Sequence, residues 1–344
     1  MSGSGASTNV PLAPLTTLGV GGAARFYIEA HTEKDIEDAI TFARHHRLPL
    51  LTLGKGSNIL VPDAGIEGVV LKISPRDIKV EEENDDSILL IAGAGALWED
   101  VVDEAVARGL FGIENLAGIP GSVGGAVVQN IGAYGAELAD TFEYADSIDR
   151  TTGMKRRITK ADAALAYRSS IFKENRAHII TRVALRLTKR AMPNIAYADL
   201  ERARTEGTPL STPLEIARAV RSIRALKFPQ NRGEGTAGSF FKNPVVDEKT
   251  LVRLRAQYPG LPVYPVSTSG GKISLAWLLD HALSLKGFSL GAARLYEKQP
   301  LIIVARAGAR ASEVDELADL VAERVFAATG IRIEREVETF GARG

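Results

Sequence analysis

Residues 118–135 read Gly-Ile-Pro-Gly-Ser-Val-Gly-Gly-Ala-Val-Val-Gln-Asn-Ile-Gly-Ala-Tyr-Gly and contain no charged side chain. Six glycines and one proline in eighteen positions predict no regular helix here, and they allow backbone conformations with positive φ. With few side chains in the way, successive backbone N–H groups can point at an anion such as a pyrophosphate. This glycine segment, residues 118–135, therefore favours a chain that wraps a large phosphorylated cofactor, although a glycine-rich surface loop would have the same composition.

The composition excludes several classes of function. The chain has 344 residues, enough for two or three domains, and 42 Lys and Arg balance 42 Asp and Glu. A neutral chain has no overall positive field for nucleic acid or an anionic membrane, so local basic groups must hold any anionic ligand. The absence of cysteine excludes disulfides, thiolate metal sites, a cysteine nucleophile and a cysteinyl cofactor link.

The sequence also contains no recognisable targeting signal or metal-binding motif. Residues 1–8 lack the basic and apolar regions of a signal peptide, and no apolar run has the length of a membrane span. We therefore expect a cytoplasmic protein with no membrane partner. The histidines show no ligand spacing, so we expect no metal; they are His31, His45, His46, His178 and His281.

Local patterns predict a mixture of short strands and helices. Capping signals are clearest at Thr32 with Asp35 and at Thr212-Pro213-Leu214-Glu215. We predict helices over 33–47, 98–108 (stopped by Gly109), 212–226, 274–285 (led by Ser274) and 313–328 (capped by Ser312 with Asp315). We predict strands over 25–30, 48–53, 67–73, 87–93, 179–187, 301–305 and 331–338, a solvated hairpin tip at 81–86, and a hinge or domain-junction loop near 228–238. This order favours an α+β fold over a regular βαβ alternation.

Several well-known functional motifs are missing from the sequence. The sequence contains no Walker loop, HExxH or GxSxG. Residues 19–24, Gly-Val-Gly-Gly-Ala-Ala, approach a dinucleotide fingerprint, but the following residues 25–30 have the pattern of a strand. Because that fingerprint needs a helix N-terminus at this point to hold the pyrophosphate, we predict that the chain has no Rossmann nucleotide domain.

Three further motifs accompany the glycine segment. Gly54-Lys-Gly-Ser-Asn58 follows a predicted strand and offers backbone donors and a hydroxyl, or it is a tight turn between strands. Tyr167-Arg-Ser-Ser-Ile-Phe-Lys173 places an arginine among aromatic and hydroxyl residues, or it is a loop with Arg168 paired at the surface. Gly238-Ser-Phe-Phe-Lys-Asn-Pro244 brackets two phenylalanines with a serine and Lys-Asn-Pro, or it is a short buried strand that ends at the proline.

In this order and spacing, the four motifs resemble the UDP-N-acetylenolpyruvoylglucosamine reductase (MurB) family of peptidoglycan synthesis. The resemblance extends from about Thr17 to Gly341. Residues 193–227, which contain Tyr197-Ala-Asp-Leu and a helix that ends Arg224-Ala-Leu-Lys227, resemble the segment carried by the type I branch of that family.

The resemblance implies an α+β fold with an FAD-binding domain of the vanillyl-alcohol-oxidase (PCMH) type in two lobes and a smaller α+β substrate-binding domain. On this basis, residues 1–75 form the first FAD-binding lobe. Residues 76–227 form the second lobe, with the type I tyrosine-loop insertion near 191–227. Residues 228–329 form the substrate-binding domain, and residues 330–344 a C-terminal strand that returns to the active site.

The resemblance also implies an activity. Family members use NADPH and non-covalent FAD to reduce UDP-N-acetyl-3-O-(1-carboxyvinyl)-glucosamine to UDP-N-acetylmuramate, as oxidoreductases of the UDP-N-acetylmuramate dehydrogenase class. NADPH gives a hydride to FAD and leaves, and the reduced flavin then gives a hydride to the vinyl carbon. We expect a monomer that binds this UDP-sugar and NADPH, and no nucleic acid. Two alternatives remain: an FAD-dependent oxidase or dehydrogenase acting on a sugar or lactone, and a nucleotide-sugar-binding protein without flavin.

The resemblance assigns roles to individual residues. Hydride addition builds negative charge beside the substrate carboxylate, and Arg168 matches the family arginine that stabilises it. Glu336 matches the C-terminal glutamate that helps to polarise the carboxyl group of the substrate. Ser239 matches the proton donor that protonates the enolate. The residues that match FAD-binding positions are Gly54, Lys55, Gly56, Ser57, Asn58, Ile119, Gly121, Ser122, Gly124, Gly125, Asn130, Gly132 and Ala133. Those that match substrate-binding positions are Tyr134, Tyr197, Arg224, Lys227, Asn243, Lys286 and Gln299.

Other interpretations of these residues stay open. Arg224 and Lys227 would also suit a solvated helix end, where cations are stabilised by the helix dipole. Arg335 stands where the family often has proline, which leaves the register of Glu336 against Glu334 and Glu338 open. Tyr296 stands where the family often has histidine, which leaves one contact with the substrate open.

Overall fold

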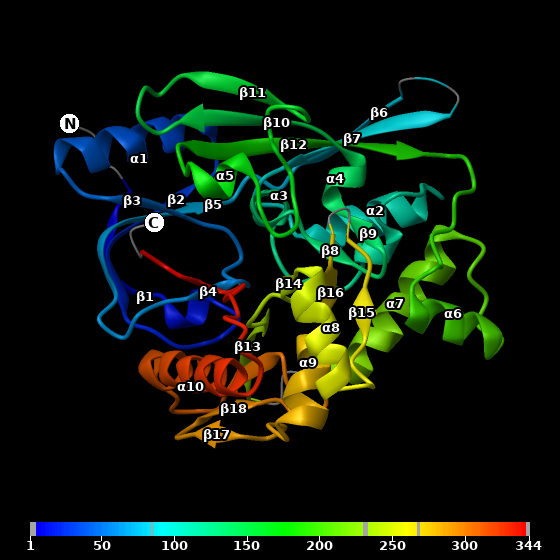
Figure 1. The fold of residues 1–344 in the computed structure, drawn as a ribbon. Coiled ribbons are helices and arrows are strands. Elements are labelled where there is room, and N and C mark those ends of the chain that lie inside the picture. The colour runs from blue at the N-terminus through cyan, green and yellow to red at the C-terminus, as the bar shows by residue number, and fades with distance from the viewer. Residues whose placement is uncertain (1–4, 83, 85, 230–232, 267–268, 342–344) are drawn as a thin grey trace. The chain divides into compact units, whose positions relative to one another are not determined.

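The chain forms two compact units (Figure 1). The computed structural model describes residues 5–82, 84, 86–229, 233–266 and 269–341. Unit 1 comprises Met1–Val10, Ala24–Lys55 and Ile66–Leu226, and unit 2 comprises Pro11–Ala23, Gly56–Gly65 and Lys227–Gly344. The four-part domain division stays a prediction, because compactness does not show which part binds which ligand. Residues 83, 85 and 230–232, which fall in the predicted hairpin tip and hinge, lie outside the described residues.

The first sheet of unit 1 has the strand order β1-β2-β5-β3. Its strands are β1 (Ser7–Pro11), β2 (Ala23–Ala30), β5 (Ile66–Ile73) and β3 (Leu50–Leu53), with β2 and β3 parallel to β5. Helix α1 (Glu33–His45) connects β2 to β3 and begins with the predicted capping box of Thr32 and Asp35. Because β2 is a strand, the fingerprint-like residues 19–24 do not lead into a helix, as we predicted.

A five-stranded antiparallel sheet forms the second layer of unit 1 (Figure 1). Its order is β11-β10-β12-β7-β6, with β11 (Lys155–Thr159), β10 (Phe142–Asp149), β12 (His178–Thr188), β7 (Ser87–Gly93) and β6 (Ile78–Glu82). Strand β6 was not predicted. Glu81 pairs with Leu89 in the register of β6 and β7, so the acidic run enters the strand instead of lying wholly in the hairpin tip.

Helices cover these sheets and share one hydrophobic core with them. Helix α7 (Pro213–Lys227) starts with the predicted capping contacts between Thr212 and Glu215, and it buries Ile216 and Val220. Ile223 is only partly buried. The remaining helices of unit 1 are α2 (Trp98–Ala107), α3 (Val123–Gln129), α4 (Leu138–Thr141), α5 (Ile171–Glu174), α6 (Ala198–Thr205) and the 3-10 turn η2 (Glu114–Leu116). The short strands β8 (Gly132–Ala133) and β9 (Ala136–Glu137) complete it.

Helix α3 lies inside the glycine segment, so the prediction of no regular helix there was wrong. Ser122 caps the helix by accepting a hydrogen bond from the Gly125 N–H at 3.4 Å, and Asn130 ends it in the left-handed conformation at φ 41°. Val123 and Val127 are fully buried. Their burial offsets the cost of about 1 kcal/mol that each helical glycine carries relative to alanine.

Unit 2 combines small sheets with one long helix. The larger sheet has the order β13-β19-β18-β17, from β13 (Gly235–Ser239), β19 (Ile302–Ala305), β18 (Ala293–Leu295) and β17 (Ser289–Leu290). The others are β14-β16-β15, from β14 (Val245–Val246), β16 (Gly271–Ile273) and β15 (Val263–Tyr264), and the parallel pair β20 (Glu338–Thr339) and β4 (Ile59–Leu60). The helical elements are η1 (Ala13–Leu15), α8 (Glu248–Gln257), α9 (Leu275–Trp277), the π-helical turn η3 (Leu278–Ala282) and α10 (Ala311–Thr329).

Three predictions for unit 2 need correction. The predicted helix 274–285 starts at the Ser274 cap but becomes a π-helical turn that ends at Ala282. Helix α10 is not capped by Ser312, because the Asp63 carboxylate accepts the Ala311 and Ser312 N–H groups at 2.7 and 3.0 Å. The predicted strand 331–338 is mostly irregular, because only Arg335 and β20 have strand partners.

No helix within the described residues has both the length and the hydropathy needed to cross a membrane.

Candidate functional site

In unit 1, the structure brings the start of the Gly54–Asn58 loop against the glycine segment. A Cβ atom added to Gly54 would lie 2.4 Å from Ser122 Oγ, so the two predicted loops touch where β3 ends. Lys72, on β5, donates a hydrogen bond to the Gly54 carbonyl. Burial and the charge of nearby Lys55 lower the pKa of Lys72. Close backbone packing and two lysines therefore meet at this loop.

The rest of that loop belongs to unit 2. Gly56 has a φ of 69°, and its carbonyl accepts the Thr17 N–H at 3.1 Å. Asn58 donates from Nδ2 to the Glu336 carbonyl at 3.0 Å, and its own carbonyl accepts the Glu338 N–H at 3.1 Å. The Asn58 side chain thus ties a predicted FAD-binding residue to the C-terminal segment.

Asn130 and Arg168 hold the end of the glycine segment. The Asn130 side chain is fully buried, donates to the Ala166 carbonyl at 2.8 Å and accepts the Ala139 N–H at 3.0 Å. Arg168 has a positive φ of 54° and donates from Nη2 to the Gly132 carbonyl at 3.0 Å. The structure therefore places the predicted catalytic arginine directly against the predicted cofactor loop.

Three predicted substrate-binding residues also cluster in unit 1. The rings of Tyr134 and Tyr197 are 5.3 Å apart in an edge-to-face arrangement, and Arg224 is hydrogen-bonded to the side chain of Tyr134. Burial raises the pKa of Tyr134, and the charge of Arg224 opposes this shift. Arg224 also donates from Nε to the Gly118 carbonyl at 3.0 Å, so it is not a solvated residue at a helix end.

The inserted segment reaches the same cluster through two asparagines. Asn115 donates from Nδ2 to the Tyr134 carbonyl at 2.8 Å and to the Asn194 carbonyl at 2.7 Å. Asn194 donates in turn to the Gly135 carbonyl at 2.9 Å. These bonds hold the segment that precedes Tyr197 against the end of the glycine segment.

In unit 2, Ser239 and Glu336 lie on neighbouring backbones. Ser239 ends β13, opposite Ile302 of β19, after a bulge at Gly238 whose φ is 77°. The next residue, Phe240, is 1% exposed, and its carbonyl accepts the Glu336 N–H at 2.8 Å. The motif therefore ends its strand at the serine instead of at Pro244, and its two phenylalanines are buried.

The structure separates the three candidate glutamates of the C-terminal segment. Glu334 forms an ion pair with Lys242, with Nζ and Oε2 2.9 Å apart. Glu338 lies in β20, opposite Ile59. Only Glu336 of these three donates its N–H to the residue that follows Ser239. This placement favours Glu336.

The remaining substrate candidates in unit 2 have different surroundings. Asn243 accepts the Leu275 N–H at 3.0 Å, and Lys286 Nζ lies 2.5 Å from Asp280 Oδ2. The Gln299 Oε1 atom is buried and has no hydrogen-bond partner within the described part of the chain. A buried acceptor of this kind needs a donor, which a polar ligand can supply. Lys227 is the last residue of α7.

The sequence analysis did not single out Lys72, Glu99 or Arg221. Lys72 and Glu99 form hydrogen bonds with the backbone of the predicted cofactor loops, and Arg221 forms a hydrogen bond with Glu99. Each looks like an ordinary charged residue on a strand or helix, and no local signal distinguishes it. Within the described ranges, no group of three or more histidines and carboxylates is arranged to hold a metal ion.

The residues of unit 1 fit a bound dinucleotide such as FAD. Their loops approach so closely at Gly54 that a side chain there would overlap Ser122, and Lys55 and Lys72 supply positive charge beside an otherwise uncharged glycine segment. A diphosphate is bound by backbone N–H groups that can approach it closely and by cationic side chains nearby.

Comparisons with known proteins agree with this assignment. Residues 24–158 match the family model of an FAD binding domain. Residues 229–340 match the model of the C-terminal domain of UDP-N-acetylenolpyruvoylglucosamine reductase. The fold and the site thus define a flavin-dependent oxidoreductase with an FAD-binding domain and a separate C-terminal domain, which confirms the predicted fold class.

Similar proteins identify the family. The chain is 37% identical over 327 residues to the UDP-N-acetylenolpyruvoylglucosamine reductase of Pseudomonas aeruginosa, covering 94% of this chain and 96% of the relative. It is 36% identical over 335 residues to that of Shewanella sp. strain ANA-3, covering 97% and 96%. The crystal structure of MurB from Thermus caldophilus superposes with a TM-score of 0.70 at 28% identity, covering 97% of this chain and 98% of that one. The chain belongs to the UDP-N-acetylenolpyruvoylglucosamine reductase (MurB) family, as the motifs predicted.

Proposed function

We propose that this chain reduces UDP-N-acetyl-3-O-(1-carboxyvinyl)-glucosamine to UDP-N-acetylmuramate with NADPH as reductant and FAD as bound cofactor. The observation that carries the proposal is the near-full-length similarity to reductases of this name, which includes both domains. The C-terminal match favours this reaction over a sugar or lactone oxidase with the same cofactor fold. The flavin supports hydride transfer from NADPH to the vinyl carbon of the substrate.

The loops of the glycine segment and of Gly54–Asn58 hold the cofactor in this proposal. Ser122 and Gly54 pack against each other, so the two loops form one continuous backbone surface in unit 1. Lys55 and Lys72 add the positive charge that a neutral chain must supply locally. Asn130 acts by fixing the end of the loop, since its side chain is bonded to protein atoms.

Arg168, Glu336 and Ser239 act on the enolpyruvyl group. Hydride addition at the vinyl carbon leaves an enolate, whose negative charge the Arg168 guanidinium stabilises through charge-assisted hydrogen bonds. Glu336 helps to polarise the carboxyl group. Ser239 Oγ then gives a proton to the enolate carbon. A serine hydroxyl is a very weak acid, so it serves as donor only to a strongly basic carbanion of this kind.

Tyr134, Tyr197, Arg224 and Lys227 bind the UDP portion. The two tyrosines, which pack edge to face, offer aromatic rings to the uracil base, and the half-buried Arg224 offers positive charge to the diphosphate. Burial lowers the pKa of Arg224, and Tyr134 and Glu99 oppose this shift. Gln299, Asn243 and Lys286 contribute from unit 2, with the unpartnered Gln299 acceptor as the best-supported of these. The proposal includes a cytoplasmic monomer, since NADPH and UDP-sugars are available in the cytoplasm.

The variant Ser239→Ala tests the proposal. We expect normal FAD binding and normal flavin reduction by NADPH, because neither step needs this hydroxyl. Flavin reoxidation by the enolpyruvyl substrate should slow by about 10²–10⁴-fold, the usual scale of a positioned general acid. Stopped-flow flavin absorbance separates the two half-reactions.

Ser289→Ala, at an exposed position of β17, is the matched control and should leave both half-reactions unchanged. Equal losses in both half-reactions of Ser239→Ala would contradict the role of Ser239. A wild-type protein that binds no flavin, or whose reduced flavin is not reoxidised by the enolpyruvyl substrate, would contradict the function itself.

A further inference from the structure

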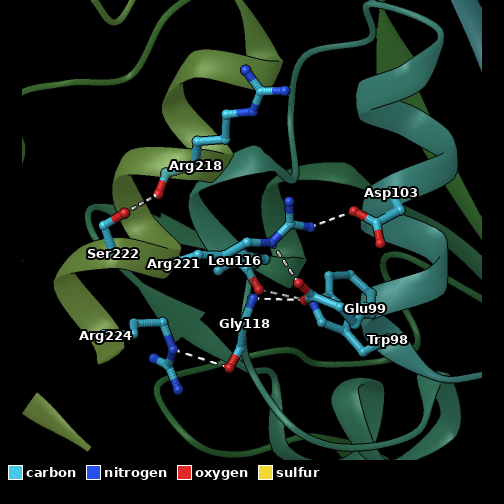
Figure 2. Close-up of polar contacts among 9 residues, drawn as sticks. All are labelled: Trp98, Glu99, Asp103, Leu116, Gly118, Arg218, Arg221, Ser222 and Arg224. Atoms are coloured by element: carbon cyan, nitrogen blue, oxygen red, sulfur yellow. Dashed lines mark hydrogen bonds and ion pairs between the residues drawn. The ribbon is translucent and has the colours of Figure 1, made fainter. Parts of the chain in front are cut away.

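Side chains from two helices form hydrogen bonds with the backbone N–H and carbonyl of Gly118, the first residue of the glycine segment (Figure 2). Glu99 of α2 accepts the Gly118 N–H at Oε2 with a distance of 2.6 Å. Arg224 of α7 donates from Nε to the Gly118 carbonyl at 3.0 Å. Gly118 is therefore fixed between α2 and α7 where the segment begins.

Arg221 connects the two helices behind Gly118. Its Nε donates to Glu99 Oε1 at 2.6 Å, and its Nη2 lies 2.5 Å from Asp103 Oδ1 (Figure 2). The side chains of Arg221 and Glu99 are only 30% and 35% exposed, so this pair is less screened by water than a surface ion pair. Burial opposes ionisation of Arg221, but hydrogen bonds and charge interactions with Glu99 and Asp103 raise its pKa overall.

The position demands glycine. Gly118 has a φ of 72°, which strains any residue with a Cβ atom. A Cβ atom here would also lie 3.2 Å from Arg224 Cδ. The backbone at Gly118 is thus packed closely against a side chain of α7. A shift of Glu99 must move the Gly118 peptide or leave its N–H without this acceptor, and loss of Arg221 removes the hydrogen bond that holds Glu99.

The same helix also reaches the other end of the segment. Arg224 is hydrogen-bonded to Tyr134, sixteen residues beyond Gly118 in the chain. Trp98, the first residue of α2, donates from Nε1 to the Leu116 carbonyl at 3.0 Å and so fixes the backbone just before Gly118. Together α2 and α7 determine where the glycine segment starts and ends.

We propose that Glu99 and Arg221 are positioning residues for FAD binding, because they fix the Gly118 peptide and hence the backbone of the glycine segment to α7. This inference rests on the proposed function, which assigns the glycine segment to FAD and Arg224 of α7 to the UDP-sugar. Since one helix carries both the anchor and Arg224, weakening the anchor lowers the affinity for FAD and raises the KM for the UDP-sugar. Neither residue touches a reacting atom.

The test uses apoprotein of the full chain, as wild type and as a set of variants. Glu99→Met removes the acceptor and the charge, Glu99→Gln keeps an acceptor for the Gly118 N–H but loses the charge, and Arg221→Met removes the bridge to α2. Arg218→Met is the control, because Arg218 is exposed on the same helix and points away from Gly118 (Figure 2). Flavin fluorescence quenching gives the FAD Kd, and thermal unfolding of the apoprotein reports stability separately.

We expect the FAD Kd to rise on the order of tenfold or more in Glu99→Met and Arg221→Met, since each loses hydrogen bonds to a charged group. Glu99→Gln should show a smaller rise, and Arg218→Met should stay within about twofold of wild type. The double variant Glu99→Met/Arg221→Met should resemble the single variants, because the two residues act as one unit.

A purely structural role predicts a different pattern. The apoprotein would then unfold at a lower temperature while folded Glu99→Met and Arg221→Met bind FAD like the Arg218 control, and this result would overturn the proposal. If the methionine variants do not fold, Glu99→Gln and Arg221→Lys must still raise the FAD Kd above that of the control; equal values overturn the proposal. A wild-type chain that binds no FAD refutes the proposed function as well, whereas binding that is unaffected by these variants refutes this inference alone.

Discussion

Gly54→Ala tests whether the close approach of the two loops in unit 1 is required. The added Cβ atom would lie 2.4 Å from Ser122 Oγ, although real Cβ atoms essentially never come within 3.0 Å of another heavy atom. Ser122 is 3% exposed and caps α3, so it cannot move aside without breaking its bond to the Gly125 N–H. The overlap must therefore displace the start of the glycine segment.

The expected cost has two parts. Overfilling a packed site costs about 1–3 kcal/mol, and losing a serine N-cap costs about 1 kcal/mol. Ser122→Gly removes the obstructing Oγ, and glycine at an N-cap is only a few tenths of a kcal/mol less favourable than serine. The double variant Gly54→Ala/Ser122→Gly should therefore recover most of the stability that Gly54→Ala loses.

Urea unfolding of the two single variants, the double variant and the wild type forms a complete cycle. We expect an interaction free energy of about 1 kcal/mol or more in favour of the double variant, and a parallel recovery of FAD affinity. Gly5→Ala is the control, because a Cβ atom at Gly5 meets nothing within 4 Å. Additive effects in the double variant would show that Gly54 and Ser122 do not compete for space and would refute the reasoning.

Two further predictions concern unit 2. Asp63 accepts the first N–H groups of α10; burial opposes its ionisation, but the bonds from Ser312 and Ala311 outweigh this and lower its pKa below 3.8. Asp63→Ala should thus cost about 0.5–2 kcal/mol at pH 7 and progressively less as the pH falls through the folded-state pKa; a difference in urea unfolding that does not shrink on acidification would contradict this. The Arg335 side chain pairs with Asp319 at 2.7 Å and also with Asp315, but the backbone bonds on either side of it hold Glu336 without that side chain. Arg335→Ala should therefore leave both flavin half-reactions within about twofold of wild type in stopped-flow traces, and reoxidation by the enolpyruvyl substrate that is about tenfold slower would contradict this.

Elements whose ends are set by nearby residues could be predicted from the sequence. The caps of α1 and α7 are examples, because the Thr32–Asp35 and Thr212–Glu215 contacts span three residues each. Strand β6 could also have been found, since Ile78 and Val80 alternate with charged residues. The acidic run that follows them suggested a solvated tip and concealed the strand.

Other elements depend on partners that are distant in the chain. Helix α10 is capped by Asp63, which is 248 residues from Ala311. Helix α3 contains two glycines, and its stability comes from the burial of Val123 and Val127 instead of from local propensity. Neither contribution can be derived from a local pattern.

The same limit applies to the candidate site. Its motifs could be found because glycines and Ser-Phe-Phe runs stand out, and their resemblance to one family supplied the roles of Arg168, Ser239 and Glu336. The residues behind the loops could not be found. Arg221 and Glu99 are 122 residues apart, and each alone has the pattern of a solvated charge on an amphipathic helix.

Position 335 shows why a departure from the family pattern need not change the site. Across the bridge between Phe241 and Arg335, the hydrogen bonds run from the Lys242 N–H to the Glu334 carbonyl at 2.9 Å and from the Glu336 N–H to the Phe240 carbonyl at 2.8 Å. Residue 335 is not the donor in either bond, so a proline there removes nothing from this bridge. Arginine in its place keeps the same register and adds ion pairs to α10. Glu336 therefore keeps its place beside the residue that follows Ser239, whichever residue precedes it.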